Sequence, residues 1–128
     1  MGKPIVGFIL GSLAALSLVP ANAQSAQVLS SAQIVEIFVG KTIKQVDDRY
    51  WAFYEPGGNL GGLYVNDEDQ GRWGFSGNRL CQRWDRWNAN QPSCFFVLKG
   101  LEGAYRFDDG AGNGFNVTVR PGNPMDLL

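Results

Sequence analysis

Hydrophobic positions follow three different spacings along this chain. An unbroken apolar run occupies residues 5–19, helical spacing follows at Ile34, Ile37 and Phe38, and alternation of apolar and polar positions begins after Gly40. Each spacing is typical of a different kind of segment, so the pattern predicts an apolar leader, a short helix and a β domain, in that order.

The first segment, residues 1–23, has the pattern of an export signal. Lys3 supplies a positive charge, an apolar run of about 15 residues follows, and Pro20 precedes the sequence Ala21-Asn22-Ala23. A run of this length is short for a membrane span, and the small-x-small site is typical of signal cleavage. We therefore predict a signal peptide at 1–23, no stable membrane anchor after its cleavage, and a periplasmic or secreted protein. An uncleaved N-terminal anchor is the alternative.

A short helix is predicted between the leader and the β domain. Residues 24–29 are small and polar and predict a flexible lead-in, so we place the single folded domain at 30–128. Ser30 and Gln33 have the spacing of a capping box, and Gly40 is a plausible end of the helix. A helix of about two turns persists only if its apolar face packs on something larger.

Short alternating segments separated by glycine, asparagine and proline fill the rest of the chain. They occupy residues 41–46, 50–55, 60–66, 72–76, 79–85, 93–99, 104–108 and 115–120. Their short connections favour an antiparallel meander, and closure into a barrel removes the exposed edges. The predicted fold class is all-β: a small antiparallel meander barrel of about eight strands with a short N-terminal helix. Such a barrel is filled by side chains or holds one small ligand, and the large aromatic residues favour a filled interior.

Two cysteines, Cys81 and Cys94, are the only ones in the chain. In an exported protein they are expected to form a disulfide. A redox-active pair or a metal site has no support, because the chain has neither a Cys-x-x-Cys motif nor a histidine. If the two cysteines face each other across an antiparallel pair, Leu80 lies opposite Phe95.

Alternation also assigns side chains to the inside of the predicted barrel. On the two cysteine strands the inward set is Leu80, Trp84, Phe95 and Val97. On neighbouring strands it is Trp51, Phe53, Trp73 and Phe75. The predicted core is therefore rich in aromatic rings.

Composition excludes several classes of function. The chain has 128 residues, no histidine and a formal net charge of −1. Without histidine there is no Ser-His-Asp or Cys-His nucleophile and no imidazole metal ligand. A net negative charge argues against nucleic-acid binding. Carboxylates such as Glu55 and Asp85 are available for acid–base chemistry, but nothing fixes two of them at a defined separation. We predict no enzyme, no catalytic residues and no cofactor.

Two acid-rich segments, 66–69 and 108–110, contain oxygen ligands suited to calcium. Neither has the spacing of an EF-hand loop, because the acid at the twelfth position is missing from both. Acid-rich hairpin turns explain both segments, so no metal site is predicted.

The most unusual segment is 83–91, in which Trp87 is flanked by Arg86, Asn88 and Asn90. An indole among amides and an arginine can form a platform for a sugar or a protein partner. Alternatively, Trp87 folds back as a lid over the barrel end. These four residues are the candidate binding residues.

Four short motifs are spread over about residues 30–120. They are Gly40-Lys41-Thr42, Gly71-Arg72-Trp73, Gly77-x-x-Leu80-Cys81-x-x-Trp84 and Cys94-Phe95. Together they resemble a family of short exported proteins from Gram-negative bacteria that carry a domain of unknown function. The resemblance implies a periplasmic or secreted β-rich domain and brings no established activity or catalytic residues.

A weaker similarity is to small periplasmic inhibitors of secreted metalloproteases. Those are also β-barrels of about this size, with a signal peptide and one disulfide, and their N-terminal segment enters the protease cleft. Residues 24–29 would have to take that part here. The helical segment that follows and the placement of the cysteines depart from the inhibitor pattern.

These observations predict an exported, non-enzymatic β-barrel domain that acts by binding a protein or a cell-envelope component. The alternatives are a protease inhibitor of the secreted-metalloprotease type and a small-ligand or carbohydrate binder that uses an aromatic site. An unfilled barrel interior would favour the small-ligand alternative.

Overall fold

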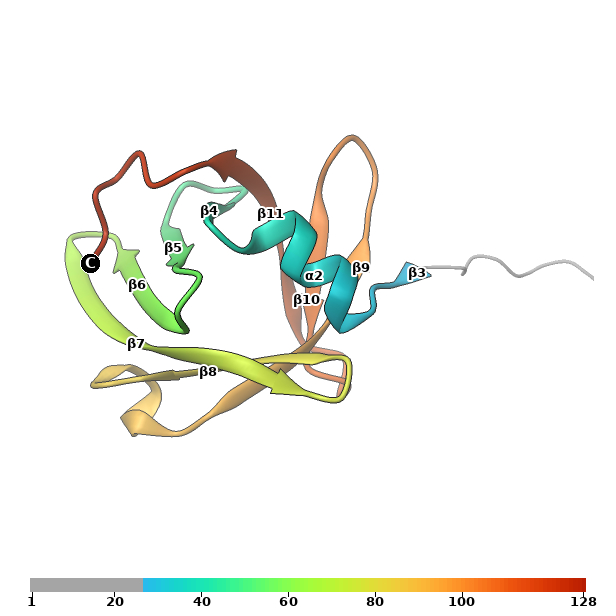
Figure 1. Cartoon of the computed structure of the whole chain (residues 1–128), viewed down its shortest axis with the longest axis horizontal. Coiled ribbons are helices and arrows are strands. Elements are labelled where there is room, and N and C mark those ends of the chain that lie inside the picture. Colours follow the sequence, from blue (N-terminus) through green and yellow to red (C-terminus); the bar gives the residue numbers. More distant parts are fainter. Residues whose placement is uncertain (1–26) are drawn as a thin grey trace, which may run out of the picture.

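A closed antiparallel barrel forms the body of the protein (Figure 1). The computed structural model describes residues 27–128, so the predicted signal peptide lies outside the described residues. Nine strands form one sheet, in which β4 to β11 close on themselves and β3 is additional. The elements are β3 (Gln27–Val28), α2 (Ser31–Phe38), β4 (Lys41–Gln45), β5 (Tyr50–Tyr54), β6 (Asn59–Tyr64), β7 (Asp67–Ser76), β8 (Arg79–Trp84), the short 3₁₀ segment η2 (Trp87–Asn90), β9 (Ser93–Lys99), β10 (Tyr105–Asp108) and β11 (Gly114–Pro121). The predicted fold class is confirmed.

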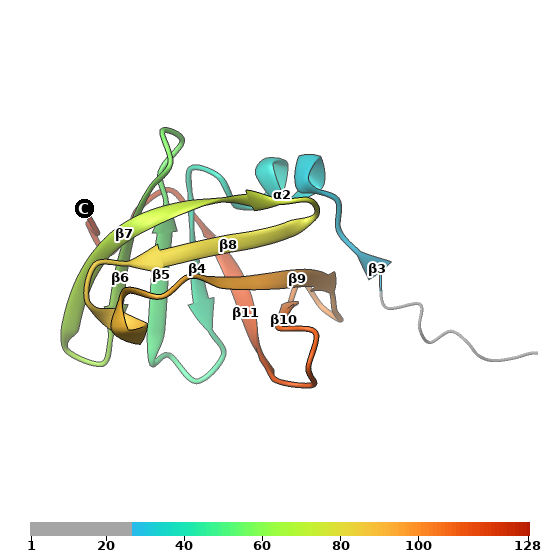
Figure 2. The ribbon, with the colours of Figure 1, turned by 90° about the horizontal axis from the view of Figure 1, so that it is seen from below.

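The barrel is a simple meander. Each strand from β4 to β11 pairs with the next along the chain, and β11 pairs with β4 to close the circle. Strand β3 pairs with the last residues of β9, beyond the part of β9 that pairs with β8. The barrel therefore has two ends. Helix α2 lies at one end, and we call the opposite end, formed by residues 46–49, 65–66, 85–92 and 109–113, the mouth (Figure 2).

Helix α2 begins with the predicted capping box. The Ser30 side chain accepts a hydrogen bond from the Gln33 N–H, and the Gln33 side chain accepts one from the Ser30 N–H. Phe38 is fully buried, and its ring meets those of Tyr105 and Phe107 edge to face at centroid distances of 5.2 and 5.8 Å. The helix thus packs its apolar side on the barrel, as a helix this short requires.

Residues 27–29, which precede the helix cap Ser30, belong to the fold as well. Gln27 and Val28 pair with β9, and Leu29 is buried and donates its N–H to the Val97 carbonyl at 2.8 Å. The last part of the predicted lead-in is therefore attached to the barrel wall.

Alternation assigned the wrong face to β5. Ala52 and Tyr54 are buried inside the barrel, so Trp51 and Phe53 take the alternate positions on the outer surface. Trp51 donates its indole N–H to the Asp48 carbonyl there. The sequence of this strand is Tyr-Trp-Ala-Phe-Tyr. Because residues on both of its faces are apolar, the pattern does not show which face points inward. On β7, by contrast, Trp73 and Phe75 pack against the core as predicted.

The outer surface of β4 and β6 is covered by the C-terminal residues. Thr42 donates its hydroxyl to the Gly122 carbonyl at 2.7 Å, and Leu127 is buried. Asn123 holds Leu127 through hydrogen bonds of 2.7 and 2.9 Å to its carbonyl and N–H. This cover buries Thr42 on the outside of the sheet.

The predicted disulfide joins Cys81 on β8 to Cys94 on β9. The two residues are direct cross-strand partners, and Leu80 lies opposite Phe95 as the sequence predicted. A disulfide fits a protein that folds outside the cytoplasm. Within residues 27–128, no helix is long and apolar enough to cross a membrane.

Replacing Cys81 with serine is expected to lower the free energy of unfolding by about 2–4 kcal/mol under oxidising conditions. The disulfide closes a sequence separation of 13 residues and so restricts the unfolded chain. Urea unfolding with and without reductant tests this. The reductant should destabilise the wild type and leave the variant unchanged, and a wild type that is insensitive to reductant would contradict the expectation.

Candidate ligand-binding site

A cavity of about 190 Å³ opens at the mouth of the barrel. Its lining comes from the mouth ends of five strands, together with one residue from within β8. The residues at the strand ends are Gln45, Tyr50, Tyr64, Trp84 and Phe115, and the residue within β8 is Gln82. All six are aromatic or amide side chains, and none is charged. The barrel is therefore filled towards the helix end and open at the mouth.

Gln82 is a polar side chain in the barrel interior, with only 6% of its surface exposed. Its Oε1 accepts a hydrogen bond from the Tyr54 hydroxyl at 2.9 Å, and its Nε2 donates to the Tyr50 hydroxyl oxygen at 3.3 Å. An amide carries two N–H donors and a tyrosine carries one O–H donor. Among residues 27–128, the second N–H of Gln82 and the O–H of Tyr50 have no acceptor.

Burial raises the pKa of both Tyr50 and Tyr54. It raises the pKa of Tyr50 well above its ordinary value, and the hydrogen bond from Gln82 offsets only part of that effect. Burial also raises the pKa of Tyr54, and the neighbouring Tyr50 adds to the rise. Both hydroxyls therefore keep their protons at neutral pH, and Tyr50 remains a hydrogen-bond donor.

Aromatic rings form the walls of this cavity. Tyr50 meets Trp84 at a centroid distance of 6.4 Å with an interplanar angle of 79°, and meets Phe115 at 5.8 Å with an angle of 89°. Edge-to-face arrangements of this kind are favourable for aromatic pairs. The cavity thus has apolar walls and hydrogen-bond donors within it.

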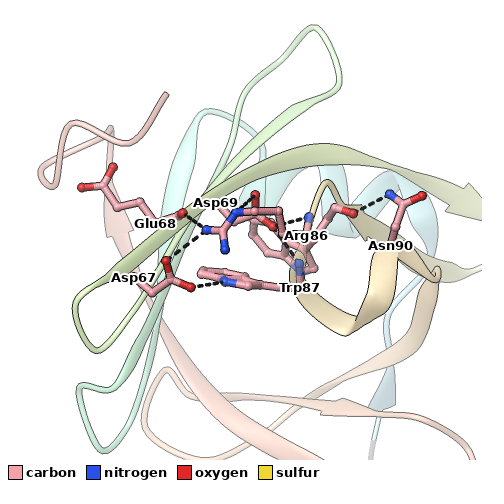
Figure 3. Close-up of polar contacts among 7 residues, drawn as sticks. Asp67, Glu68, Asp69, Arg86, Trp87 and Asn90 are labelled. Atoms are coloured by element: carbon pink, nitrogen blue, oxygen red, sulfur yellow. Dashed lines mark hydrogen bonds and ion pairs between the residues drawn. The ribbon is translucent and has the colours of Figure 1, made fainter.

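Trp87 folds back over the barrel end. Its ring lies 4.6 Å from that of Trp84 and 6.5 Å from that of Tyr50, and its indole N–H donates to Asp67 Oδ2 at 2.8 Å (Figure 3). This is the lid arrangement, one of the two alternatives that the sequence left open.

Two carboxylates hold the lid in place. Asp69 is nearly buried and accepts the backbone N–H groups of Arg86 and Trp87, each at 2.9 Å. Asp67 accepts from the Arg86 guanidinium at 3.0 Å as well as from the indole (Figure 3). The sequence predicted an acid-rich hairpin turn at 66–69. The turn instead lies at residues 65–66, and Asp67 begins β7.

Hydrogen bonds keep both of these carboxylates ionised. The Trp87 indole N–H, and then Arg86, lower the pKa of Asp67. Burial alone would raise the pKa of Asp69, but backbone N–H groups of Trp87, Arg86 and Gln70 outweigh it, so that this pKa is also lowered. The lid is therefore anchored by charge-assisted hydrogen bonds at neutral pH.

The other two candidate binding residues shape the segment behind the lid. Asn90 donates its side-chain N–H to the Trp84 carbonyl at 2.7 Å (Figure 3), and Asn88 donates to the Gln91 carbonyl at 3.1 Å. Both have positive φ angles, a conformation that asparagine tolerates better than most residues. The structure thus brings Arg86 and Trp87 to the barrel end and uses Asn88 and Asn90 to form the turn.

Sequence reasoning missed most of the cavity lining. Gln82 was the available signal, because it lies on the inward face between Leu80 and Trp84, where a polar side chain is unusual. Tyr50 gave no such signal, because the inward face of β5 could not be read from its sequence.

A larger groove, about 460 Å³, lies beside the lid and is lined by Gly62, Glu68, Asp69, Gln70, Asp85, Arg86 and Leu128. Its one basic side chain, Arg86, already pairs with Asp67 and Asp69. Within residues 27–128, no group of three or more metal-ligating side chains is placed to hold an ion. The mouth cavity, with donors that lack acceptors, is the better candidate site.

Comparison with known proteins gives no relative from which a function could be transferred. No protein-family model, curated protein or solved structure matches the chain.

Proposed function

We propose that this protein is an exported, non-enzymatic β-barrel that binds a small ligand in the mouth cavity. The observation that carries the proposal is a pair of donors without acceptors at this cavity, on the buried Gln82 amide and the partly buried Tyr50 hydroxyl. An unsatisfied buried donor costs about 1–3 kcal/mol, and a ligand that accepts these hydrogen bonds would remove that cost. A periplasmic or secreted location is part of the proposal, and the disulfide supports it.

The small-ligand alternative is supported over a protein partner bound at Trp87 and Arg86 by where the free hydrogen-bonding groups lie. Trp87 and Arg86, the candidate anchors for a protein partner, are hydrogen-bonded to Asp67 and Asp69. The groups without partners face the mouth cavity, whose volume of about 190 Å³ suits a small molecule.

The proposal is tested by screening a library of small organic fragments against the disulfide-bonded protein with two-dimensional NMR. We expect hits to shift the indole N–H signals of Trp84 and Trp87. Phe115→Trp adds volume to the cavity wall and is expected to weaken those hits by at least about tenfold, or about 1.4 kcal/mol.

Phe96→Trp is the matched control, since Phe96 lies on the outer surface with 37% of its area exposed. It should bind the fragments as the wild type does. Two results together would contradict the proposal: hits that shift the signals of the larger groove beside the lid, and an affinity for those hits that Phe115→Trp leaves unchanged.

A further inference from the structure

The mouth cavity also restricts the chemistry of its ligand. We infer that the ligand is a neutral molecule of about one ring that accepts hydrogen bonds through an oxygen and donates few. This inference rests on the proposed function and names the ligand class for the same site.

Size follows from the volume of the cavity. A closed apolar cavity of about 150 Å³ in another protein holds one benzene molecule. The mouth cavity of about 190 Å³ therefore takes one six-membered ring with a small substituent.

Neutrality follows from the lining, in which no residue is charged. Asp67, one of the two carboxylates that hold the lid, is already paired with Arg86 and Trp87. The Arg49 guanidinium lies over the outer part of the mouth, 6.0 Å from the centre of the Tyr64 ring. Arg49 is not part of the lining, so a charged ligand inside the cavity would lose hydration without an opposite charge among the lining residues.

The need for an acceptor follows from the hydrogen bonds inside the cavity. The Gln82 N–H and the Tyr50 O–H are both donors, whereas the Gln82 carbonyl is already occupied by the Tyr54 hydroxyl. A carbonyl or ether oxygen would pair with these donors. A sugar ring carries several hydroxyl donors, whereas the lining offers further side-chain acceptors only on Gln45, Tyr50 and Tyr64, so some of these hydroxyls would lack an acceptor. The aromatic walls likewise favour a ring with few polar groups.

The inference is tested with two isosteric probes, acetophenone and ethylbenzene, which differ in the carbonyl oxygen. Titration of the full, disulfide-bonded chain is followed through the side-chain amide signal of Gln82 and the indole signal of Trp84. We expect acetophenone to bind at least about tenfold more tightly than ethylbenzene, because only acetophenone satisfies the buried donors. Benzoate and methyl β-D-glucopyranoside are expected to bind more weakly than acetophenone.

Tyr50→Phe removes one donor and keeps the ring. In this variant the preference for acetophenone over ethylbenzene should fall, while the affinity for ethylbenzene stays the same. Tyr105→Phe removes a hydroxyl on a strand end away from the mouth and is the matched control. If Tyr50→Phe fails to fold, the relative affinities of the wild type for acetophenone and ethylbenzene test the inference without it.

Ethylbenzene, benzoate or the glucoside binding in the mouth as tightly as acetophenone would overturn the ligand class and leave the proposed function standing. If none of the four probes moves the mouth signals, and the fragment library moves none either, both proposals fail.

Discussion

Replacing Phe38 with alanine is expected to lower the free energy of unfolding by about 3–5 kcal/mol. The Phe38 side chain has no exposed surface, and it contacts Tyr54, Tyr105 and Phe107. Its loss removes the ring through which α2 packs on the barrel and leaves a cavity that three large rings cannot fill. Urea unfolding followed by tryptophan fluorescence measures the change.

Val35→Ala is the control on the same helix, since Val35 points outward with 45% of its surface exposed. An exposed substitution of this kind is expected to change stability by no more than about 0.5 kcal/mol. If Phe38→Ala were as mild as Val35→Ala, the helix would not contribute to closing this end of the barrel.

Features that depend on a few neighbouring residues could be predicted from the sequence. The capping box needs only Ser30 and Gln33, and both of its hydrogen bonds are present. The pairing of β8 with β9 was fixed in advance because a disulfide between Cys81 and Cys94 allows a single local register. The number and order of the eight barrel strands followed from the spacing of the turns, whereas the additional strand β3 was not predicted.

Features that depend on distant contacts could not be predicted. Strand β5 has apolar residues on both of its faces. Its sequence therefore gave no sign that Trp51 and Phe53 lie on the outer face. The C-terminal residues gave no periodic signal, yet Leu127 is buried through its hydrogen bonds to Asn123. Such contacts join segments whose approach the local pattern does not encode.

The candidate site was predicted only in part for the same reason. The composition of 83–91 drew attention to Trp87, but its position as a lid depends on Asp67 and Asp69, which belong to a different strand. The acid-rich segment and the tryptophan-rich segment are two halves of one arrangement. Read separately, the first predicted a turn, and the second left a platform and a lid as alternatives.

Replacing Gly62 with alanine is expected to lower the free energy of unfolding by about 3 kcal/mol, at the upper end of the usual cost of overpacking. A Cβ atom at this position would lie 2.4 Å from Trp84 Cη2 and 2.7 Å from Trp87 Cζ3. Trp84 is buried, and Trp87 is held by Asp67, so neither ring can move without breaking other contacts. Urea unfolding measures the loss, and the NMR signal of the Trp87 indole N–H reports whether its hydrogen bond to Asp67 survives.

Gly74→Ala is the matched control, because a Cβ atom at Gly74 would meet nothing within 4 Å. It should leave stability unchanged or raise it by up to about 1 kcal/mol, since glycine is unfavourable within a strand. The difference in unfolding free energy between Gly62→Ala and Gly74→Ala therefore isolates the clash with the two indoles from the general effect of replacing a strand glycine. If Gly62→Ala behaved like Gly74→Ala and left the Trp87 signal in place, the close packing of the lid on the barrel would be wrong. If it displaces the lid as expected, the same variant should also lose its ligands, because Trp84 is a wall of the mouth cavity.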